Sequence, residues 1–289
     1  MRAAGAKTGM AREERSPRAW TRLDLLLVAR GLAESRERAQ AAVLAGEVLV
    51  EGRPAAKPGM RVAPDAAVAL VPRRPRYVSR GGDKLAHALR AFALPVTGTV
   101  ALDVGASTGG FTDCLLQHGA VRVYAVDVGR GQLDWRLRRD PRVVVLERTH
   151  AAHLDAQVVP EAVDLATVDV SFISLTRVLP AVARRVRPGG SIIALVKPQF
   201  EAGRGQVRKG VVRDPRIHLE VLRRLVRWIR EQGWWVAGVT PSPLAGPKGN
   251  LEFFLWVVKD GGRPAEEVDA GIEEAVQAAH AQPRKAGRS

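Results

Sequence analysis

The sequence predicts an α/β protein in which seven strands alternate with helices, preceded by a small α+β domain. Its 289 residues are enough for a mid-sized domain with a small companion. From Val100 onward, short apolar runs alternate with amphipathic helical segments, which is typical of a mainly parallel sheet covered by helices. We therefore expect five segments: a disordered basic tail 1–20, a small domain 21–72, a stiff basic linker 73–76, a large α/β domain 77–260 and a C-terminal tail 261–289.

The small domain is predicted to contain two helices and a short sheet. Ser35 is placed as the N-cap of the second helix, Gly31 to stop the first in a left-handed cap, and Gly46 to end the second. A turn at Pro58 and Gly59 separates the two strands that follow. The expected elements are helices Thr21–Arg30 and Arg36–Ala45 and strands Glu47–Val50 and Ala67–Val71.

The large domain opens with a strand, a glycine-rich turn, a helix and a second strand, which is the start of a Rossmann-like α/β fold. Seven strands are expected, at Val100–Val104, Val121–Val126, Val143–Leu146, Leu165–Asp169, Ser191–Val196, Trp234–Gly238 and Leu251–Val258. Three helices are expected among them, at Phe111–His118, Leu175–Val186 and Pro215–Gln232. Beyond Gly261 the pattern indicates only a weak helical stretch.

The charge balance points to a phosphate-rich partner. The chain has 45 Lys and Arg against 30 Asp and Glu, a formal net charge of +15. Such an excess attracts nucleic acid at long range. A coding bias explains the preference for Arg over Lys, but it does not explain why basic residues outnumber acidic ones so widely.

Several classes of protein are excluded by composition. The single cysteine, Cys114, excludes a disulfide scaffold and a cysteine-rich metal site, and the six scattered histidines lack the spacing of metal ligands, so we expect no metal. No apolar run is long enough to span a membrane, and residues 1–20 lack the apolar segment of a secretory signal. We expect a cytoplasmic protein that does not bind membranes.

A glycine-rich loop follows the first strand of the large domain. Asp127 stands at the tip of the next strand, where an acid can accept hydrogen bonds from ribose hydroxyls. The loop differs from the Gly-x-Gly-x-x-Gly pattern of pyrophosphate binders, which favours a ribose-bearing ligand without phosphates, such as S-adenosylmethionine. The alternative is a loop with no ligand. The candidate cofactor-binding residues are Asp103, Gly105, Ala106, Ser107, Gly109, Gly110, Phe111 and Asp127.

Four charged residues stand at the ends of apolar segments or inside them: Lys84, Asp169, Lys197 and Glu252. Burying an isolated Lys197 or Glu252 would be costly, so we expect the four charges to compensate one another in one cleft at the carboxyl edge of the sheet. Each of them alone could instead be a solvated residue.

The small domain resembles the alpha-L RNA-binding domain first described in a small-subunit ribosomal protein. The resemblance covers about fifty residues, chiefly 22–36 and 45–50. It implies that the second helix and the following turn face RNA. The implied RNA-binding residues are Arg22, Ser35, Arg36, Arg38 and Lys57. A solvated helix face is the alternative interpretation of these charges.

The chain from Thr21 to Lys259 closely resembles the TlyA family, in which an alpha-L domain precedes an FtsJ-like methyltransferase domain. The matching segments are Tyr77–Leu85, Asp103–Gly110, Ala125–Leu133, Thr167–Leu175, Leu195–Glu201, Asp214–Pro215 and Gly249–Leu255. The family, often named hemolysin, is understood as ribosomal RNA cytidine 2′-O-methyltransferases that use S-adenosylmethionine. The resemblance thus implies a Rossmann-like seven-stranded methyltransferase fold with a small N-terminal α+β alpha-L RNA-binding domain.

The resemblance also assigns roles to residues. The lysine, aspartate, lysine and glutamate tetrad of FtsJ-like enzymes falls on Lys84, Asp169, Lys197 and Glu252. After the third strand the family pattern is roughly Glu-x-Thr-Asn-x-Arg, whereas this chain has His150 and Ala152 at the last two defined positions, on the adenine side of the implied pocket. The implied partner is ribosomal RNA or a ribosomal subunit, and we expect a monomer.

Methyl transfer from a sulfonium is an in-line displacement, so the enzyme must hold the 2′-oxygen close to the methyl group. Lys197 is expected to remove the proton of the hydroxyl or to orient it, and the sequence leaves both roles open. Two other functions stay open: a non-catalytic RNA-binding assembly factor, and a membrane-active hemolysin.

Overall fold

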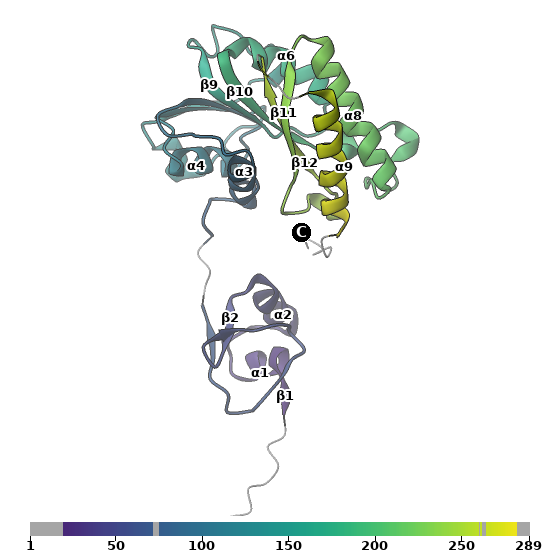
Figure 1. Ribbon diagram of the computed structural model, residues 1–289. Helices are drawn as coiled ribbons and strands as arrows, with labels where there is room; N and C mark the ends of the chain where they lie inside the picture. The colour runs from purple at the N-terminus through teal and green to yellow at the C-terminus, as the bar shows by residue number, and fades with distance from the viewer. Residues whose placement is uncertain (1–19, 72–74, 260, 262–263, 282–289) are drawn as a thin grey trace, which may run out of the picture. The chain divides into compact units, whose positions relative to one another are not determined.

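The computed structural model describes residues 20–71, 75–259, 261 and 264–281. The chain forms two compact units, which divide between Arg74 and Pro75 (Figure 1). Each unit is described by itself. The expected N-terminal tail, except for its last residue, and the first half of the expected linker lie outside the described residues.

The first unit packs two helices against short strands. Ser35 accepts a hydrogen bond from Arg38 N and so caps the second helix, and Gly46 ends that helix with φ +76°. The first helix begins at Leu23 rather than Thr21, because the two residues before it pair with another strand. The elements are β1 Thr21–Arg22, α1 Leu23–Ala29, α2 Arg36–Ala45, β2 Val48–Val50, β3 Arg53–Pro54, β4 Arg61–Val62 and β5 Val68–Leu70.

The second unit is built on one sheet of seven strands, as the sequence predicts. The strands are β6 Val100–Val104, β7 Arg122–Val126, β8 Val143–Leu146, β9 Val163–Val168, β10 Val186–Val196, β11 Trp235–Pro241 and β12 Phe253–Val258. Their order across the sheet is β11-β12-β10-β9-β6-β7-β8. The pairs from β10 to β8 are parallel, and β12 runs antiparallel to both of its neighbours. The parallel part is buried on both faces, which explains its nearly continuous apolar runs.

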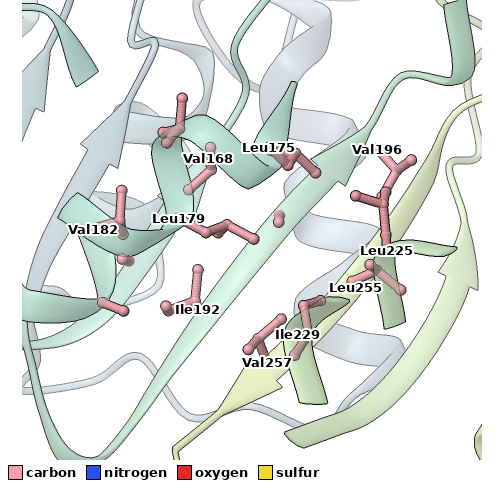
Figure 2. Close-up of a cluster of buried hydrophobic side chains, with 14 of the residues drawn as sticks. Val168, Leu175, Leu179, Val182, Ile192, Val196, Leu225, Ile229, Leu255 and Val257 are labelled. Carbon is pink, nitrogen blue, oxygen red and sulfur yellow. The ribbon is translucent and has the colours of Figure 1, made fainter. Parts of the chain in front are cut away.

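Helices cover both faces of the sheet (Figure 1). They are α3 Arg80–Ala91, α4 Gly110–Gln117, α5 Trp135–Arg138, α6 Leu175–Arg185, α7 Pro198–Glu201, α8 Pro215–Glu231 and α9 Ala265–Ala281, with 3-10 turns at Ala151–His153, Arg204–Gln206 and Pro247–Gly249. The helices α3 and α4 pack on one face, and α6, α8 and α9 pack on the other. Figure 2 shows the hydrophobic core on the face that α6, α8 and α9 cover. There Leu179 of α6 and Leu225 of α8 pack with Ile192 of β10 and Leu255 of β12. Burying one such side chain stabilises the fold by roughly 1.5–3 kcal/mol.

The segment after Gly261 is more than a tail. Residues Ala265–Ala281 form α9, which packs against β11 and α8 and contributes Val268, Ile272 and Val276 to the core. These three residues recur every four positions, but the alanines and glycine among them weaken the contrast between the apolar and polar faces. The core of the second unit therefore extends to this helix, beyond the boundary that the sequence predicts at residue 260.

Candidate active site

Chemistry-bearing residues from four strands meet at one edge of the sheet. Gly105 follows β6, Asp169 follows β9 and Lys197 follows β10, and these three strands are parallel. Glu252 precedes β12, which is antiparallel to β10 with Phe253 opposite Val196. The start of β12 and the end of β10 therefore lie at the same carboxyl edge, where open α/β sheets bind ligands.

The four tetrad residues form two ion pairs at this edge. Lys84, in the first turns of α3, donates from Nζ to Glu252 Oε2 at 2.5 Å. Lys197 Nζ lies 2.6 Å from Asp169 Oδ1 and donates to Ser171 Oγ at 2.9 Å. Only 12% of either lysine side chain is exposed. The structure thus brings the four predicted residues together as mutually compensating charges.

The two ion pairs influence each other. Burial raises the pKa of the Glu252 carboxyl, while Lys84 and then Lys197 lower it, and Asp169 raises it. Gly246 covers this carboxylate, since a Cβ built on Gly246 would overlap Glu252 Oε1. The loop that carries Gly246 is therefore in direct contact with the tetrad, and only glycine permits that approach.

A cavity of about 610 Å³ opens beside the tetrad. Its size is that of a small-molecule site. It is lined by Ser79, Arg80, Gly81 and Lys84 at the start of α3, by Gly105, Ala106, Ser107, Thr108, Gly110 and Phe111, by Asp169, and by Ala245, Gly246, Pro247 and Lys248. Seven of the residues predicted from the sequence line it. Asp103, Gly109, Asp127, Lys197 and Glu252 are not among the lining residues.

Gly105 shapes the wall of this cavity. Its φ is +89°, a left-handed conformation that favours glycine, and a Cβ there would overlap the carbonyl oxygen of Asp169. The backbone of the glycine-rich loop can therefore lie directly against the end of β9. This approach brings the loop and Asp169 to the same wall of the cavity.

The side chain of Asp103 lies in the interior and not at the cavity wall. It is fully buried, and its carboxylate accepts hydrogen bonds from Thr112 Oγ1 at 2.7 Å and Thr167 Oγ1 at 3.0 Å. Burial raises its pKa to about 7. Asp103 therefore joins β6, β9 and α4 in the interior, and its side chain does not reach the cavity.

Asp127 holds the glycine-rich loop in place. Its Oδ2 accepts from Ser107 N at 2.8 Å, and its Oδ1 accepts from Gly129 N at 2.7 Å. A carboxylate oxygen has more than one acceptor site, so these bonds leave capacity for a ligand hydroxyl. Asp127 fixes the loop whether or not it also contacts a ligand.

The segment after β8, where the resemblance places the adenine side of the pocket, departs from the family pattern and has its own local structure. His150 Nδ1 accepts from Ala152 N at 3.2 Å and caps the turn Ala151–His153. Glu147 Oε1 accepts from Gly131 N at 2.6 Å. The histidine thus holds the chain after β8, at the position where the family pattern has asparagine.

Sequence reasoning missed two residues next to the tetrad. Phe172, three residues after Asp169, is 89% exposed, has φ +63° and lies with its ring centroid 4.8 Å from that of Phe200. Glu201 accepts from Leu175 N at 2.7 Å and from Ser174 Oγ at 2.8 Å, and burial raises its pKa. Glu201 therefore ties the turn after Lys197 to the loop of Phe172. No local pattern indicates that Phe172 is exposed, whereas Glu201 is an acid in the segment Leu195–Glu201 that also contains Lys197.

In the first unit, two of the five predicted RNA-binding residues bind one buried acid. Asp24 accepts from Arg22 Nε and Nη2, from Arg36 Nε and from Gln40 Nε2, at 2.9–3.0 Å. These bonds, led by Arg22, hold the pKa of Asp24 well below its usual value. Ser35 serves as a helix cap, and Arg38 and Lys57 are exposed. Asp24 thus orients two of the five predicted residues.

The described residues contain neither a cluster of metal ligands nor a membrane-spanning helix. No three His, Cys, Asp or Glu side chains gather there as a metal site. None of the helices in that part of the chain is long and apolar enough to cross a membrane.

Comparison with known proteins identifies both units. The S4 domain matches residues 21–68, and the FtsJ-like methyltransferase family matches residues 77–259. A Mycobacterium tuberculosis protein named 16S/23S rRNA (cytidine-2'-O)-methyltransferase TlyA is 48% identical over 260 residues, which are 89% of this chain and 96% of that protein. The YqxC protein of Bacillus subtilis, which is named as an rRNA methyltransferase, is 47% identical over 88% of this chain and 93% of its own length.

A solved structure supports the same assignment. A Streptococcus thermophilus protein described as a hemolysin is 42% identical and superposes with a TM-score of 0.70, covering 91% of this chain and 96% of that one. The matches span almost the whole length of these relatives and both units of this chain. The chain therefore belongs to the TlyA family, in which an S4 domain precedes an FtsJ-like methyltransferase domain.

Proposed function

We propose that this chain is an S-adenosylmethionine-dependent 2′-O-methyltransferase that acts on cytidine in ribosomal RNA. The proposal rests on two ion pairs, Lys84 with Glu252 and Lys197 with Asp169, which lie beside a cavity lined by a glycine-rich loop. The rRNA methyltransferase names of the relatives support the substrate class.

The cavity fits the proposed cofactor by its chemistry. The helices α3 and α4 both begin at its wall, and the positive end of a helix dipole suits a carboxylate such as that of the methionyl part. Asp169, on the same wall, suits the positively charged part of the ligand. The backbone of Gly105, Ala106 and Ser107 would hold the cofactor, with Asp127 serving the ribose. Bound there, S-adenosylmethionine supplies an electrophilic methyl group.

The tetrad would then orient and deprotonate the 2′-hydroxyl of the substrate. Lys197 Nζ is held between Asp169 and Ser171, which fixes its direction. An amine held in this way orients the hydroxyl oxygen, and it takes the hydroxyl proton as the oxygen attacks once it has released its own extra proton to water. The pair of Lys84 and Glu252 keeps the opposite side of the site charged and rigid. In this proposal Lys197 is the tetrad residue that contacts the 2′-hydroxyl of the substrate.

The exposed ring of Phe172 supports a nucleic-acid substrate. An aromatic face stacks on any base, and stacking contributes roughly 1–3 kcal/mol per base. Glu201 keeps the Phe172 loop tied to the turn that follows Lys197. We propose that the base of the target nucleotide leaves its stack and rests against Phe172.

Replacing Asp127 by alanine should weaken S-adenosylmethionine binding about tenfold or more, since a charge-assisted hydrogen bond is worth roughly 1.5–3 kcal/mol. The substitution also removes the bonds to Ser107 N and Gly129 N, so the loop loses its support. Calorimetric titration measures the effect, with Asp134→Ala as a matched control, since that acid caps α5 outside the cavity. An unchanged affinity in Asp127→Ala would refute the cofactor assignment.

Separating the two units tests the RNA dock. The segment from Tyr77 onward contains the cavity and its own core, so it should bind S-adenosylmethionine like the full chain. It should lose most of its affinity for ribosomal subunits, because the predicted RNA-binding residues lie on the first unit. Filter binding at several salt concentrations measures the affinity for ribosomal subunits. A second test uses the full-length protein with the three substitutions Arg36→Ala, Arg38→Ala and Lys57→Ala. If neither change altered affinity or its salt slope, the S4 domain would not be the dock.

The proposed reaction has a direct assay. The protein is incubated with methyl-labelled S-adenosylmethionine and unmodified ribosomal subunits, and the RNA is digested to nucleosides. Label should appear in 2′-O-methylcytidine. A non-catalytic assembly factor would bind the subunits without incorporating label. We further propose that the protein acts as a monomer in the cytoplasm, where ribosomal subunits are assembled.

A further inference from the structure

A tight hairpin presents basic residues close to the cavity. Arg208 and Val211 exchange both backbone hydrogen bonds, at 3.0 and 3.1 Å, across a two-residue turn. The turn residues Lys209 and Gly210 have φ +51° and +78°, which is the left-handed pair of a type I′ turn. Arg208 and Lys209 are both exposed. The turn therefore holds two cationic side chains on a short, defined piece of backbone.

Asn250 fixes this hairpin to the loop that touches the tetrad. Its side chain is buried, with 3% of the residue exposed. Its Nδ2 donates to Gly210 O at 2.9 Å and to Pro247 O at 3.0 Å, and its Oδ1 accepts from Val212 N at 3.1 Å. Its backbone carbonyl accepts from Gly246 N at 2.8 Å. One residue thus links the hairpin to Gly246, which covers Glu252.

A third cation joins the hairpin. Lys248, exposed on the cavity loop, has its Nζ 3.4 Å from the position of a Cβ built on Gly210. Within the described parts of the chain, no acidic side chain pairs with Arg208, Lys209 or Lys248. Three uncompensated positive charges at one edge of a cavity favour an anionic partner.

We propose that Arg208, Lys209 and Lys248, here called the hairpin cluster, bind the RNA phosphate backbone beside the nucleotide that is methylated. The proposal rests on the proposed function for the identity of the strand. Phosphates recur along one side of an RNA strand, and a cluster on rigid backbone can meet two or three of them. The cluster is a second RNA contact on the methyltransferase unit, and through Asn250 the strand is positioned relative to Glu252 and its partners.

The test uses the full-length protein and its binding to single-stranded RNA. The double variant Arg208→Ala and Lys209→Ala is compared with the control double variant Arg184→Ala and Arg227→Ala, which removes the same charge. Arg184 and Arg227 are exposed, form no ion pair with a described residue and do not line the cavity. The logarithmic salt slope of RNA binding should become less steep by about 1.4 in the hairpin variant, since each lost phosphate contact removes about 0.7 for single strands. Adding Lys248→Ala should remove about 0.7 more.

The control double variant should keep the wild-type slope, and the affinity of the hairpin double variant for S-adenosylmethionine should stay unchanged. Equal slopes in the two double variants would overturn the proposal. So would polyglutamate displacing RNA as well as a second RNA does, because the surface would then suit acidic protein. If wild-type protein transferred no methyl group while the hairpin variant still lost its salt slope, the proposed reaction would fail and the RNA contact would stand.

Discussion

Replacing Lys197 by arginine is expected to abolish methyl transfer to ribosomal subunits while leaving the affinity for S-adenosylmethionine nearly intact. The amine of Lys197 is held 2.6 Å from Asp169 Oδ1 and 2.9 Å from Ser171 Oγ, in a site where 12% of the side chain is exposed. Arginine keeps the charge, but it does not readily lose a proton, and its planar fork does not fit a site shaped around one amine. Lys197 is also absent from the lining of the cofactor cavity.

Incorporation of tritiated methyl groups at saturating cofactor measures this effect. The matched control is Lys259→Arg, since Lys259 follows the far end of β12 and donates to Val186 O. The control should keep near-normal turnover. Retention of more than about a tenth of the wild-type rate in Lys197→Arg, which corresponds to about 1.4 kcal/mol of barrier, would contradict the proposed role.

The pair of Lys84 and Glu252 should show strong coupling in a double-mutant cycle. Glu252 is fully buried and Lys84 nearly so, and their 2.5 Å contact is the main compensation for the Glu252 charge. Removing one partner of a buried pair costs roughly 3–5 kcal/mol of the free energy of unfolding, whereas replacing both partners is often close to neutral. We expect that loss in Glu252→Gln and in Lys84→Met, and a much smaller loss in the double variant.

Chemical denaturation measures the cycle, and the methyl transfer assay is run on the same proteins. The double variant should regain stability without regaining activity, because the charges would be absent from the site. Losses that simply add in the double variant would show that the two residues do not interact. A stable and fully active double variant would show that the pair is not part of the machinery.

Local signals predicted much of the fold correctly. The second helix has the bounds that Ser35 and Gly46 suggest, because caps depend on neighbouring residues alone. The seven strands are confirmed, since buried parallel strands require apolar runs. The carboxyl-edge argument placed Lys197 and Glu252 at one edge of the sheet, and the register of β10 with β12 gives its physical basis. Charges at strand ends are informative because they must find partners there.

The sequence pattern does not predict contacts between segments that are distant in the chain. Nothing in the pattern shows that Thr112 and Thr167 hold the carboxylate of Asp103 in the interior. Nothing in the pattern shows that Asn250 bonds to the hairpin at Gly210, forty residues earlier in the chain. The exposure of Phe172 likewise depends on how its loop is fixed by Glu201. Such features follow from tertiary packing rather than from periodicity or local propensity.

Mapping of 2′-O-methyl groups on ribosomal RNA tests the central claim most directly. Ribosomal RNA is compared from four kinds of cell: cells that carry the gene, cells from which it is deleted, and deleted cells that express either the wild-type or the Lys197→Arg protein. We expect at least one cytidine to lose its 2′-O-methyl group without the gene, to regain it with the wild-type protein and to stay unmodified with Lys197→Arg. An identical methylation map in all four samples would contradict the assignment of this chain as a ribosomal RNA cytidine 2′-O-methyltransferase.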